Sequence, residues 1–406
     1  MPGSTLQLQA AYNGDSFSTQ DSFILSQDSR ANFFEYAYMK YTNFASEIIK
    51  IPTNEKLTWG RKTHAVIPKA GHLLSNLYLA LELPALSVVD GEWVGWTDTL
   101  GYAIFNKLEI EIGGIIVESL EPQFMDLYDE LVRGKENIGG NKMILKSDTY
   151  VAVQRNAIRT QTLMIPLPFF FTRQYNLSLP LLSLTNPDIR VNMEFKQFDE
   201  CIHYDGTTPP AFAEIVDANI YGEYYYLDES IMDTFQEQTH RYVIDSVQYN
   251  GIESIGPGLG THISSLKFNH LVRELAFVLV DANSIANNDH LNYSRYTDEN
   301  ALIKSANMYM VNTPRFETDL PETYLRTVFA YKQHSVVPNK HIYIIPFGLD
   351  SETNQPTGAL NFSRLDNVSL HLKMTSGNPE VFLYVFAIYH NFITIADGSL
   401  YIEFDV

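Results

Sequence analysis

Two pairs of histidines have the residue type and spacing that could hold a metal ion. Thr63-His64 is followed by His72, and Thr261-His262 is followed by His270. A metal site inside a β-barrel needs two histidines on one strand face, with a third histidine and a carboxylate converging on them. These pairs belong to separate parts of the chain, so neither domain supplies that set. We therefore interpret the four histidines as structural residues at strand ends and predict no metal site.

Nucleophilic and phosphate-binding chemistry has equally little support. Cys201 is the only cysteine, which excludes an intramolecular disulfide and a thiolate metal cage. The nearby His203 is not placed to act as its base, and we expect the thiol to be buried or at a strand edge. Gly256-Pro-Gly-Leu-Gly260 contains proline, lacks a Lys-Ser/Thr pair and precedes no predicted helix, so we interpret it as a hairpin loop. We predict no catalytic residue, no cofactor and no enzymatic activity.

A cluster of carboxylates could bind a cation. Asp126, Asp129 and Glu130 lie close together in a segment with helical periodicity. On a helix they fall opposite Phe124 and Leu131, which is the arrangement of a solvated polar face next to a buried apolar one. We therefore predict that these three carboxylates are exposed to solvent.

Four sequons for N-glycosylation occur in the sequence. The N-terminus lacks the basic start and apolar run of a signal peptide, so we expect the chain to be made in the cytosol and not to meet the secretory glycosylation machinery. Only Asn292, in a long polar loop, is predicted to lie at the surface. The sequons begin at Asn176, Asn292, Asn361 and Asn367.

The composition favours a β-rich protein that does not bind nucleic acid directly. The chain has 406 residues, which predicts two domains, and its 25 Tyr and 24 Phe favour strands over helices. Its net charge of −20 opposes contact with a phosphate backbone. No apolar run is long enough to span a membrane.

An internal duplication organises the chain. Thr63-His64-Ala-Val-Ile-Pro-Lys69-Ala-Gly-His72-Leu73 recurs as Thr261-His262-Ile-Ser-Ser-Leu-Lys267-Phe-Asn-His270-Leu271, with five identical positions at an offset of 198. Apolar residues then alternate with the period of a strand in both copies. These residues are Leu77, Leu79 and Leu81 in the first copy, and Leu275, Phe277 and Leu279 in the second.

About eight strand-like runs in each half predict an all-β fold of two tandem eight-stranded antiparallel jelly-roll barrels with short helices in the loops. One helix is expected from Pro122 to Gly134, with Phe124, Leu127, Tyr128 and Leu131 on its apolar face, and a shorter one near Leu320 to Leu325. We divide the chain into an N-terminal arm (1–30), a first jelly-roll domain (31–228), a linker (229–239) and a second jelly-roll domain (240–406). The arm lacks periodicity and is expected to order on a partner.

Several stretches resemble the major capsid protein of the nucleocytoplasmic large DNA viruses, the double jelly-roll family of the chlorella viruses and iridoviruses. The resemblance runs in family order from about residue 31 to the C-terminus. Asn361-Phe-Ser-Arg-Leu-Asp-Asn367 is its most specific stretch. The other stretches are Phe33-Phe34 with Tyr41–Ala45, Leu108–Gly114, Phe169–Phe171, Leu179–Leu184, Phe268–His270, Gly358–Leu360 and Tyr389–Ile395.

The resemblance implies a structural protein of the virion capsid, assembled in the host cytoplasm. It implies a homotrimeric, pseudo-hexagonal capsomer that tiles an icosahedral shell around double-stranded DNA. The implied partners are neighbouring capsomers, minor capsid or cement proteins and a penton protein, with an inner viral membrane and host-surface glycans as further partners. The loops 84–100 and 281–300 are short for this family, which leaves two alternatives: a minor or penton-associated paralogue, or the capsid protein of an unusually compact lineage.

A carbohydrate-binding or receptor-binding module is the competing function from another class. Jelly-roll modules of this kind stack exposed aromatic side chains on sugars. Trp93 and Trp96 in the loop 84–100, and Tyr293 and Tyr296 in the loop 281–300, are the candidate residues. This function requires their rings to be exposed.

Overall fold

Two facing antiparallel sheets form the first half of the chain, up to Leu227. The computed structural model describes residues 42–91, 93–133, 138–146, 157–353 and 355–404. One sheet has the order β1-β11-β3-β7 and the other the order β2-β9-β5-β6. Their bounds are Phe44–Pro52 (β1), Asp217–Leu227 (β11), Leu73–Leu83 (β3), Gln161–Pro166 (β7), Lys62–Ile67 (β2), Ile189–Phe195 (β9), Phe105–Ile112 (β5) and Ile115–Leu120 (β6).

The second half, from His240 onward, repeats this arrangement strand for strand. Its sheets have the orders β12-β22-β15-β19 and β14-β21-β16-β17. The predicted all-β fold is confirmed, and in the described residues the two main sheet paths of each half hold four strands each, in the same order in both halves. The bounds are His240–Tyr249 (β12), Val381–Ala396 (β22), Leu271–Asp281 (β15), Tyr343–Pro346 (β19), Thr261–Leu266 (β14), Val368–Met374 (β21), Ile303–Met310 (β16) and Thr313–Pro314 (β17).

Short strands and helices occupy the connections. The strands are β4 (Val94–Trp96), β8 (Leu179–Pro180), β10 (Ile202–Tyr204), β13 (Glu253–Ile255), β18 (Leu320–Pro321), β20 (Leu360–Asn361) and β23 (Ser399–Ile402). The α-helices are α3 (Leu100–Ala103), α4 (Pro122–Tyr128), α5 (Ile138–Met143), α7 (Phe170–Arg173), α8 (Glu229–Glu237), α9 (Ala282–Ala286) and α10 (Phe329–Gln333). The remaining turns are the π-helices η1 (Asp129–Arg133) and η4 (Tyr324–Val328), and the 3-10 helices η2 (Tyr175–Leu177), η3 (Phe198–Cys201) and η5 (Phe362–Arg364). None of the helices in the described ranges is long and apolar enough to cross a membrane.

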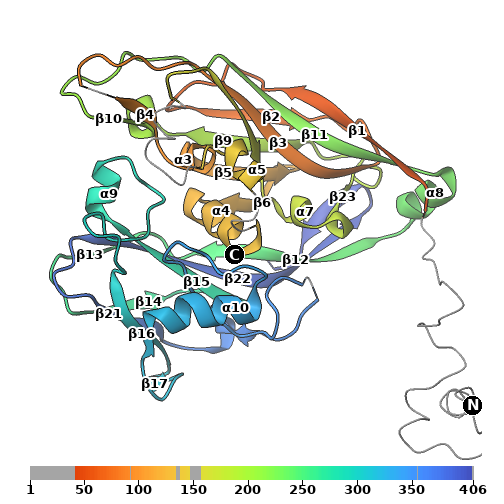
Figure 1. The fold of residues 1–406 in the computed structure, drawn as a ribbon. Helices are drawn as coiled ribbons and strands as arrows, with labels where there is room; N and C mark the ends of the chain where they lie inside the picture. Colours follow the sequence, from red (N-terminus) through yellow and green to blue (C-terminus); the bar gives the residue numbers. More distant parts are fainter. Residues whose placement is uncertain (1–41, 92, 134–137, 147–156, 354, 405–406) are drawn as a thin grey trace, which may run out of the picture. The chain divides into compact units, whose positions relative to one another are not determined.

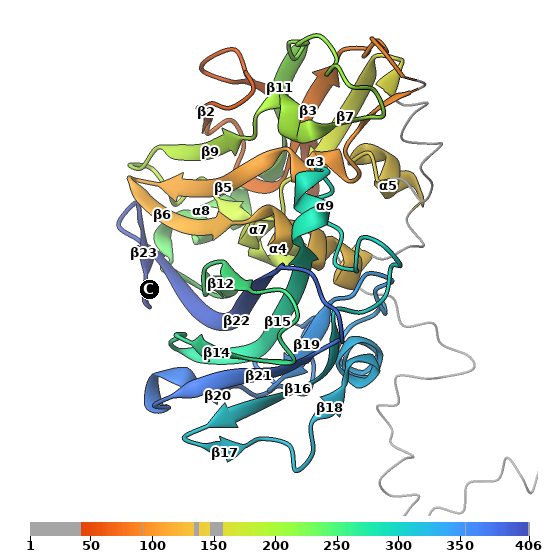
Figure 2. The same cartoon turned by 90° about the vertical axis from the view of Figure 1, so that its left-hand side faces the viewer.

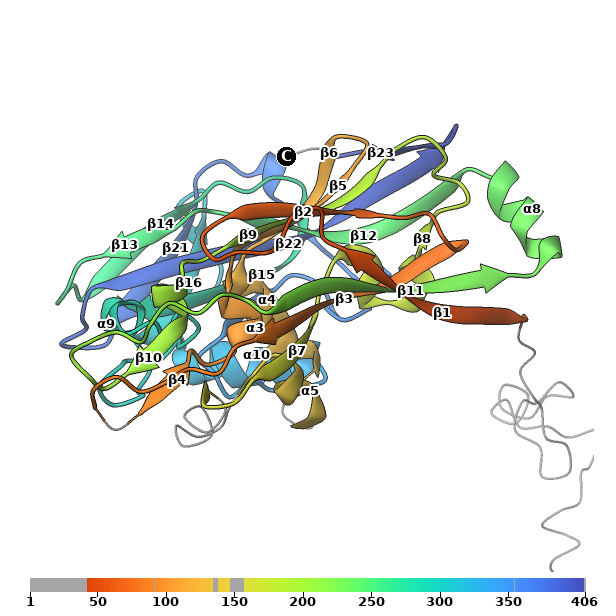
Figure 3. The ribbon, with the colours of Figure 1, turned by 90° about the horizontal axis from the view of Figure 1, so that it is seen from above.

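The halves lie one above the other with α4 between them (Figure 1). Figure 2 shows α4 between the sheet that contains β5 and β6 and the sheet that contains β12 and β22. The predicted linker, residues 229–239, contains the helix α8, which joins β11 to β12 at one end of the molecule (Figure 3). The predicted arm, residues 1–30, lies outside the described residues.

The sequence offset between corresponding strands of the two halves is not constant: it differs by one residue between two successive strands of the repeat. β3 and β15 begin at Leu73 and Leu271, an offset of 198, whereas β2 and β14 begin at Lys62 and Thr261, an offset of 199. Because a shift of one residue moves a strand's side chains to the opposite face, the aligned histidines are not structurally equivalent. His64 lies on the face opposite the buried Ala65, whereas His262 shares the face of the buried Ser264.

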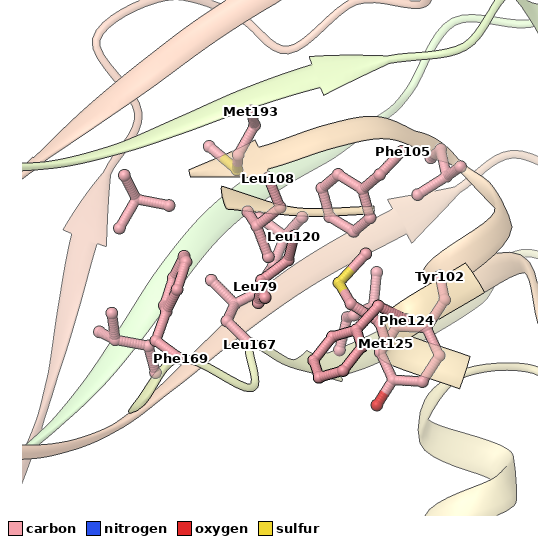
Figure 4. Packing of buried hydrophobic residues seen from close by; sticks show 14 of the residues in the cluster. Leu79, Tyr102, Phe105, Leu108, Leu120, Phe124, Met125, Leu167, Phe169 and Met193 are labelled. Atoms are coloured by element: carbon pink, nitrogen blue, oxygen red, sulfur yellow. The ribbon is translucent and has the colours of Figure 1, made fainter. Parts of the chain in front are cut away.

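The predicted apolar face of each long strand is confirmed, and β15 is buried on its other face as well. Leu77, Leu79 and Leu81 face the interior of the first half, where α4 also contributes buried side chains (Figure 4). Leu275, Phe277 and Leu279 face the interior of the second half. The alternate residues Ala276, Val278 and Val280 belong to the core cluster of the first half. The outer face of the second half's sheet is therefore an interface between the halves.

The first predicted helix is confirmed, and the second is longer and later than predicted. Pro122 is the first residue of α4, and helical geometry continues to Arg133; the predicted end at Gly134 lies outside the described residues. The second helix covers residues 322–333. Leu320 and Pro321 form the strand β18 instead, because a residue before proline is disfavoured in helical geometry.

The loop Gly256–Gly260 joins two sheets and is not the predicted hairpin. β13, before the loop, pairs with β22, and β14, after it, pairs with β21. The two flanking strands do not pair with each other, so the glycines allow the chain to cross between sheets.

Candidate functional site

The contact between the two halves brings together buried ion pairs and packed aromatic side chains, so it is the candidate functional site. The centre of this contact is the helix α4. Phe124 is 2% exposed, and its ring centroid lies 5.6 Å from that of Phe386 on β22. The helix thus packs on the second half through the predicted apolar face.

The acidic cluster on this helix is buried, which corrects the predicted solvated face. Asp126 is fully buried, and Asp129 and Glu130 are 8% and 5% exposed. Lys340 of the second half donates to both carboxylate oxygens of Asp126 at 2.8 Å, and Lys146 lies 2.8 Å from Glu130. Helical spacing places carboxylates on one face, but this face is covered by Lys340 from the other half and by Lys146 from the same half.

The electrostatics of this cluster favour the charged form of the lysines. Burial alone lowers the pKa of Lys340, and the carboxylates of Asp126 and Glu130 outweigh it, so the pKa is raised. The pKa of Lys146 is raised by the same balance. Lys340 also lies 5.5 Å from the centroid of the Tyr293 ring. The two halves are therefore joined by a largely buried lysine that stays protonated at neutral pH.

A second group of charges crosses the interface beside α4. Arg173, at the end of α7, pairs with the buried Glu118 and donates to the backbone carbonyl of Asp245 at 2.9 Å. The Asp245 carboxylate in turn lies 2.9 Å from Arg273 on β15. Burial raises the pKa of Glu118, and the Arg173 charge opposes this shift. Arg173 therefore ties the first half to β12, which the Asp245 carboxylate in turn joins to β15.

A cavity of about 200 Å³ lies against these charges. Its wall includes Leu127, Leu131 and Ile388, together with the His334–Glu274 pair, whose atoms Nε2 and Oε2 are 3.0 Å apart. Burial lowers the pKa of His334, but the carboxylates of Glu274 and Glu352 outweigh this effect and raise it. The cavity therefore has mainly apolar walls with charged groups at one side of the junction.

The loops 84–100 and 281–300 meet each other, and two of the four aromatic candidates are buried. Thr97 donates to the backbone carbonyl of Asn288. Trp96 is fully buried and stacks on Trp59 with ring centroids 5.9 Å apart, and Tyr293 is 1% exposed. Trp93 is half-buried, and Tyr296 is 44% exposed. The prediction of exposed sugar-stacking rings is thus wrong for Trp96, which packs on Trp59 and Phe198 of its own half, and for Tyr293, which belongs to the core cluster of the other half.

The histidines that could have formed a metal site each lie in a separate environment. His64 meets the amide of Asn54 at 2.8 Å, His72 accepts from the backbone N–H of Leu227, and His262 lies 2.9 Å from Glu253. The ring of His270 stacks on Tyr389. Within the described ranges, no three His, Cys, Asp or Glu side chains come together as a metal-binding group.

Cys201 is buried, as predicted, and burial raises the pKa of its thiol to about 12. The thiol therefore stays protonated at neutral pH and is a poor nucleophile. His203 lies 3.1 Å from the hydroxyl of Thr97. This arrangement is structural packing.

Asn292 is not the exposed sequon that the sequence suggested. It is half-buried, and its side chain bonds to Asp289 and Ser294. Asn176 and Asn367 are the exposed ones. The polar loop around Asn292 folds into a local turn in which its amide is already used.

Two protein-family models match the chain one after the other. Residues 32–228 match the major capsid protein N-terminus, and residues 232–400 match the large eukaryotic DNA virus major capsid protein. The chain belongs to the major capsid protein family of large eukaryotic DNA viruses. The resemblance found in the sequence is confirmed, and the chain is a structural protein of the virus capsid and not an enzyme.

Relatives in this family match over nearly the whole chain. It is 27% identical to the major capsid protein of Pyramimonas orientalis virus, over 98% of both sequences. It is 25% identical to that of Paramecium bursaria Chlorella virus 1, over 88% of this chain and 85% of the relative.

Solved structures of capsid proteins share the fold. PBCV-1 VP54 matches with a TM-score of 0.80 and 22% identity, over 92% of this chain and 100% of the matched one. The Faustovirus major capsid protein matches with a TM-score of 0.74 and 11% identity, over 97% and 96% of the two chains. Both likenesses support the double jelly-roll fold.

Most of the residues that join the halves are not marked by any local pattern in the sequence. Lys340 lies in a polar loop, 214 residues from Asp126, and no local pattern marks it. The run Leu275–Val280 did carry a signal: six consecutive apolar residues indicate a strand that is buried on both faces.

Proposed function

We propose that the chain is the building block of a pseudo-hexagonal capsomer: a homotrimer in which six jelly-roll halves surround a threefold axis and tile the icosahedral shell of a large double-stranded DNA virus. The observation that carries this proposal is the repeat of one eight-strand order in both halves of one chain. Three such chains form a ring of six similar blocks. A hexagonal outline lets identical capsomers cover a flat facet with nearly equivalent edge contacts.

The proposed role of each segment follows the domain boundaries predicted from the sequence. Residues 31–228 and 240–406 are the two jelly-roll domains, residues 229–239 connect them, and residues 1–30 act as an arm that contacts minor capsid or cement proteins. The capsomers meet neighbouring capsomers and a penton protein, and assembly takes place in the host cytoplasm. The chain aligns with a major capsid protein over 98% of that relative's length, and this favours the major protein over a minor paralogue.

The remaining proposed partners follow from charge and position. The net charge of −20 keeps free capsomers soluble and away from the DNA backbone, so the proposal includes no direct contact with nucleic acid. An inner viral membrane and host-surface glycans remain predicted partners. The burial of Trp96 and Tyr293 removes two of the residues on which glycan binding would depend.

Electron microscopy of the purified protein tests the outline. We expect particles with a hexagonal outline made of six similar lobes. A variant that lacks residues 1–25 serves as a comparison: it should give the same particles but should not support shell assembly when it replaces the full chain. Round or two-lobed particles of the full chain would contradict the proposal, and normal shells from the truncated chain would contradict the role of the arm.

A further inference from the structure

A short segment of the second half, residues 288–290, is hydrogen-bonded to a turn of the first half, residues 196–204. The segment follows α9, which lies at the same end of the molecule as β4 and β10 (Figure 1 and Figure 3). The side-chain amide of Asn288 donates to the backbone carbonyls of Asp199 at 2.7 Å and Ile202 at 2.8 Å. These hydrogen bonds form a second, polar contact between the halves, in addition to the packing around α4.

His290 belongs to the same contact and is buried. Its side chain is 8% exposed, and the ring atom Nε2 lies 2.9 Å from the backbone carbonyl of Glu200. A carbonyl oxygen only accepts, so Nε2 carries the proton and the neutral ring is sufficient for the hydrogen bond. Protonation adds a second N–H, at Nδ1, and places a positive charge on a ring that is largely closed off from solvent.

Two basic side chains of the first half face His290 across the contact. They are Lys196 and His203, and both oppose protonation of the histidine ring. Lys196 is itself only 8% exposed. Burial lowers the pKa of Lys196 and the pKa of His203 as well. The contact thus gathers three basic groups in a place where an added positive charge is poorly solvated.

The acidic side chains around the contact do not offset this arrangement. The Glu200 carboxylate accepts from a backbone N–H of its own turn, and the Asp289 carboxylate accepts from a side-chain amide of its own loop. Asp98 raises the pKa of His203, but burial outweighs this effect. The protonation of His290 is therefore governed by burial, by its two basic neighbours and by the Glu200 carbonyl.

The contact is expected to weaken in acid. Burial, together with Lys196 and His203, lowers the pKa of His290 to about 4, although the Glu200 carbonyl opposes the shift. In a detached segment the ring has its ordinary pKa of about 6.5. Because the contact disfavours the protonated ring, its stability is complete above about pH 6.5 and falls as the pH decreases from about 6.5 to about 4.

We infer that the segment 288–290 is released by acid: protonation of His290 and His203 detaches it from the first half, while the apolar packing around α4 holds the halves together. Phe124 and Phe386 form the centre of that packing and carry no titratable group. The inference goes beyond the proposed capsomer, because it describes a change within one chain.

Release of the segment uncovers the turn that contains Cys201. The cysteine is fully buried, and it lies between Glu200 and Ile202, whose carbonyls the segment binds. It is also the only cysteine in the chain. The accessibility of this thiol therefore reports whether the segment is attached.

The rate at which dithiodipyridine labels Cys201, from about pH 7.5 to about pH 4.5, tests the inference. This disulfide also reacts with thiols in acid, and each rate is divided by that of glutathione at the same pH. We expect the normalised rate of the full wild-type chain to rise at least about tenfold towards the acidic end, because the detached ring regains its ordinary pKa. A normalised rate that does not rise in acid would overturn the inference.

The variant His290→Gln separates the histidine from other effects of acid. The glutamine amide donates to the Glu200 carbonyl but does not titrate, so this variant should lose most of the acid-dependent rise. His64→Gln is the matched control, because His64 meets the amide of Asn54 at 2.8 Å and takes no part in the contact, and it should keep the wild-type profile. Equal rises in His290→Gln and in the wild type would contradict the inference.

The variant Asn288→Ala gives a readout at neutral pH that does not depend on titration. It removes the hydrogen bonds to Asp199 and Ile202, so labelling of Cys201 should become about tenfold faster at about pH 7.5. An unchanged rate would show that the segment does not cover the thiol and would overturn the inference.

Far-UV circular dichroism of the same samples distinguishes local release from unfolding. We expect the β-sheet signal of the wild-type chain to be the same at both ends of the pH range. A loss of this signal that parallels the labelling would overturn the inference, because the thiol would then be exposed by unfolding of the first half.

Discussion

Replacing Asp126 with alanine is expected to lower the free energy of unfolding by about 3–5 kcal/mol, because it leaves Lys340 as a buried charge without its partner. Asp126 is fully buried, and the Lys340 side chain is only 19% exposed. Denaturant unfolding at a fixed protein concentration measures the loss, since association shifts the apparent stability.

Two further variants separate pairing from simple loss of packing. Asp126→Leu/Lys340→Met should recover much of the lost stability, because a packed apolar pair can replace a buried ion pair. Glu214→Ala removes the exposed ion pair with Lys56 and should leave the denaturation midpoint unchanged. If Asp126→Ala were no more damaging than Glu214→Ala, the halves would not be held together by this pair.

Phe124→Ala is expected to destabilise the chain by a similar amount, about 3–5 kcal/mol. The side chain is 2% exposed, packs on Phe386 and lies under the guanidinium of Arg173, 5.8 Å from the ring centroid. The substitution leaves a cavity between two rigid sheets, which cannot collapse to fill it.

Thermal or denaturant unfolding of this variant should also show whether the halves unfold together. Leu349→Ala is the control, because Leu349 is 81% exposed and its truncation should change stability by no more than about 0.5 kcal/mol. We expect one transition, at a lower denaturant concentration than in the wild type. An unchanged midpoint for Phe124→Ala would mean that α4 does not couple the halves.

Local patterns predicted the elements well. The alternation Leu77, Leu79, Leu81 identified a strand with one core face, because side chains on a strand alternate between faces. Pro122 marked the start of a helix, because proline fits the first helical position. The duplication itself showed that the chain has two similar halves.

Burial that depends on distant parts of the chain was not predicted correctly from local patterns. Asp126 looked like part of a solvated face, because nothing near it in sequence marks the second half that covers it. The Thr-His repeat suggested equivalent histidines, but the loop after β2 has one residue more than the loop after β14, which reverses the face. Trp96 is buried by Trp59 and Phe198, and Tyr293 by the core of the other half, and both contacts join residues that are far apart in the sequence.

The mass of the purified chain in solution is the measurement that tests the capsomer most directly. Light scattering over a range of concentrations should give a stable particle of about 139 kDa, three times the chain mass of 46.3 kDa. A particle that remains at 46.3 kDa at high concentration would contradict the account, because one chain supplies only two of the six similar blocks that the ring requires.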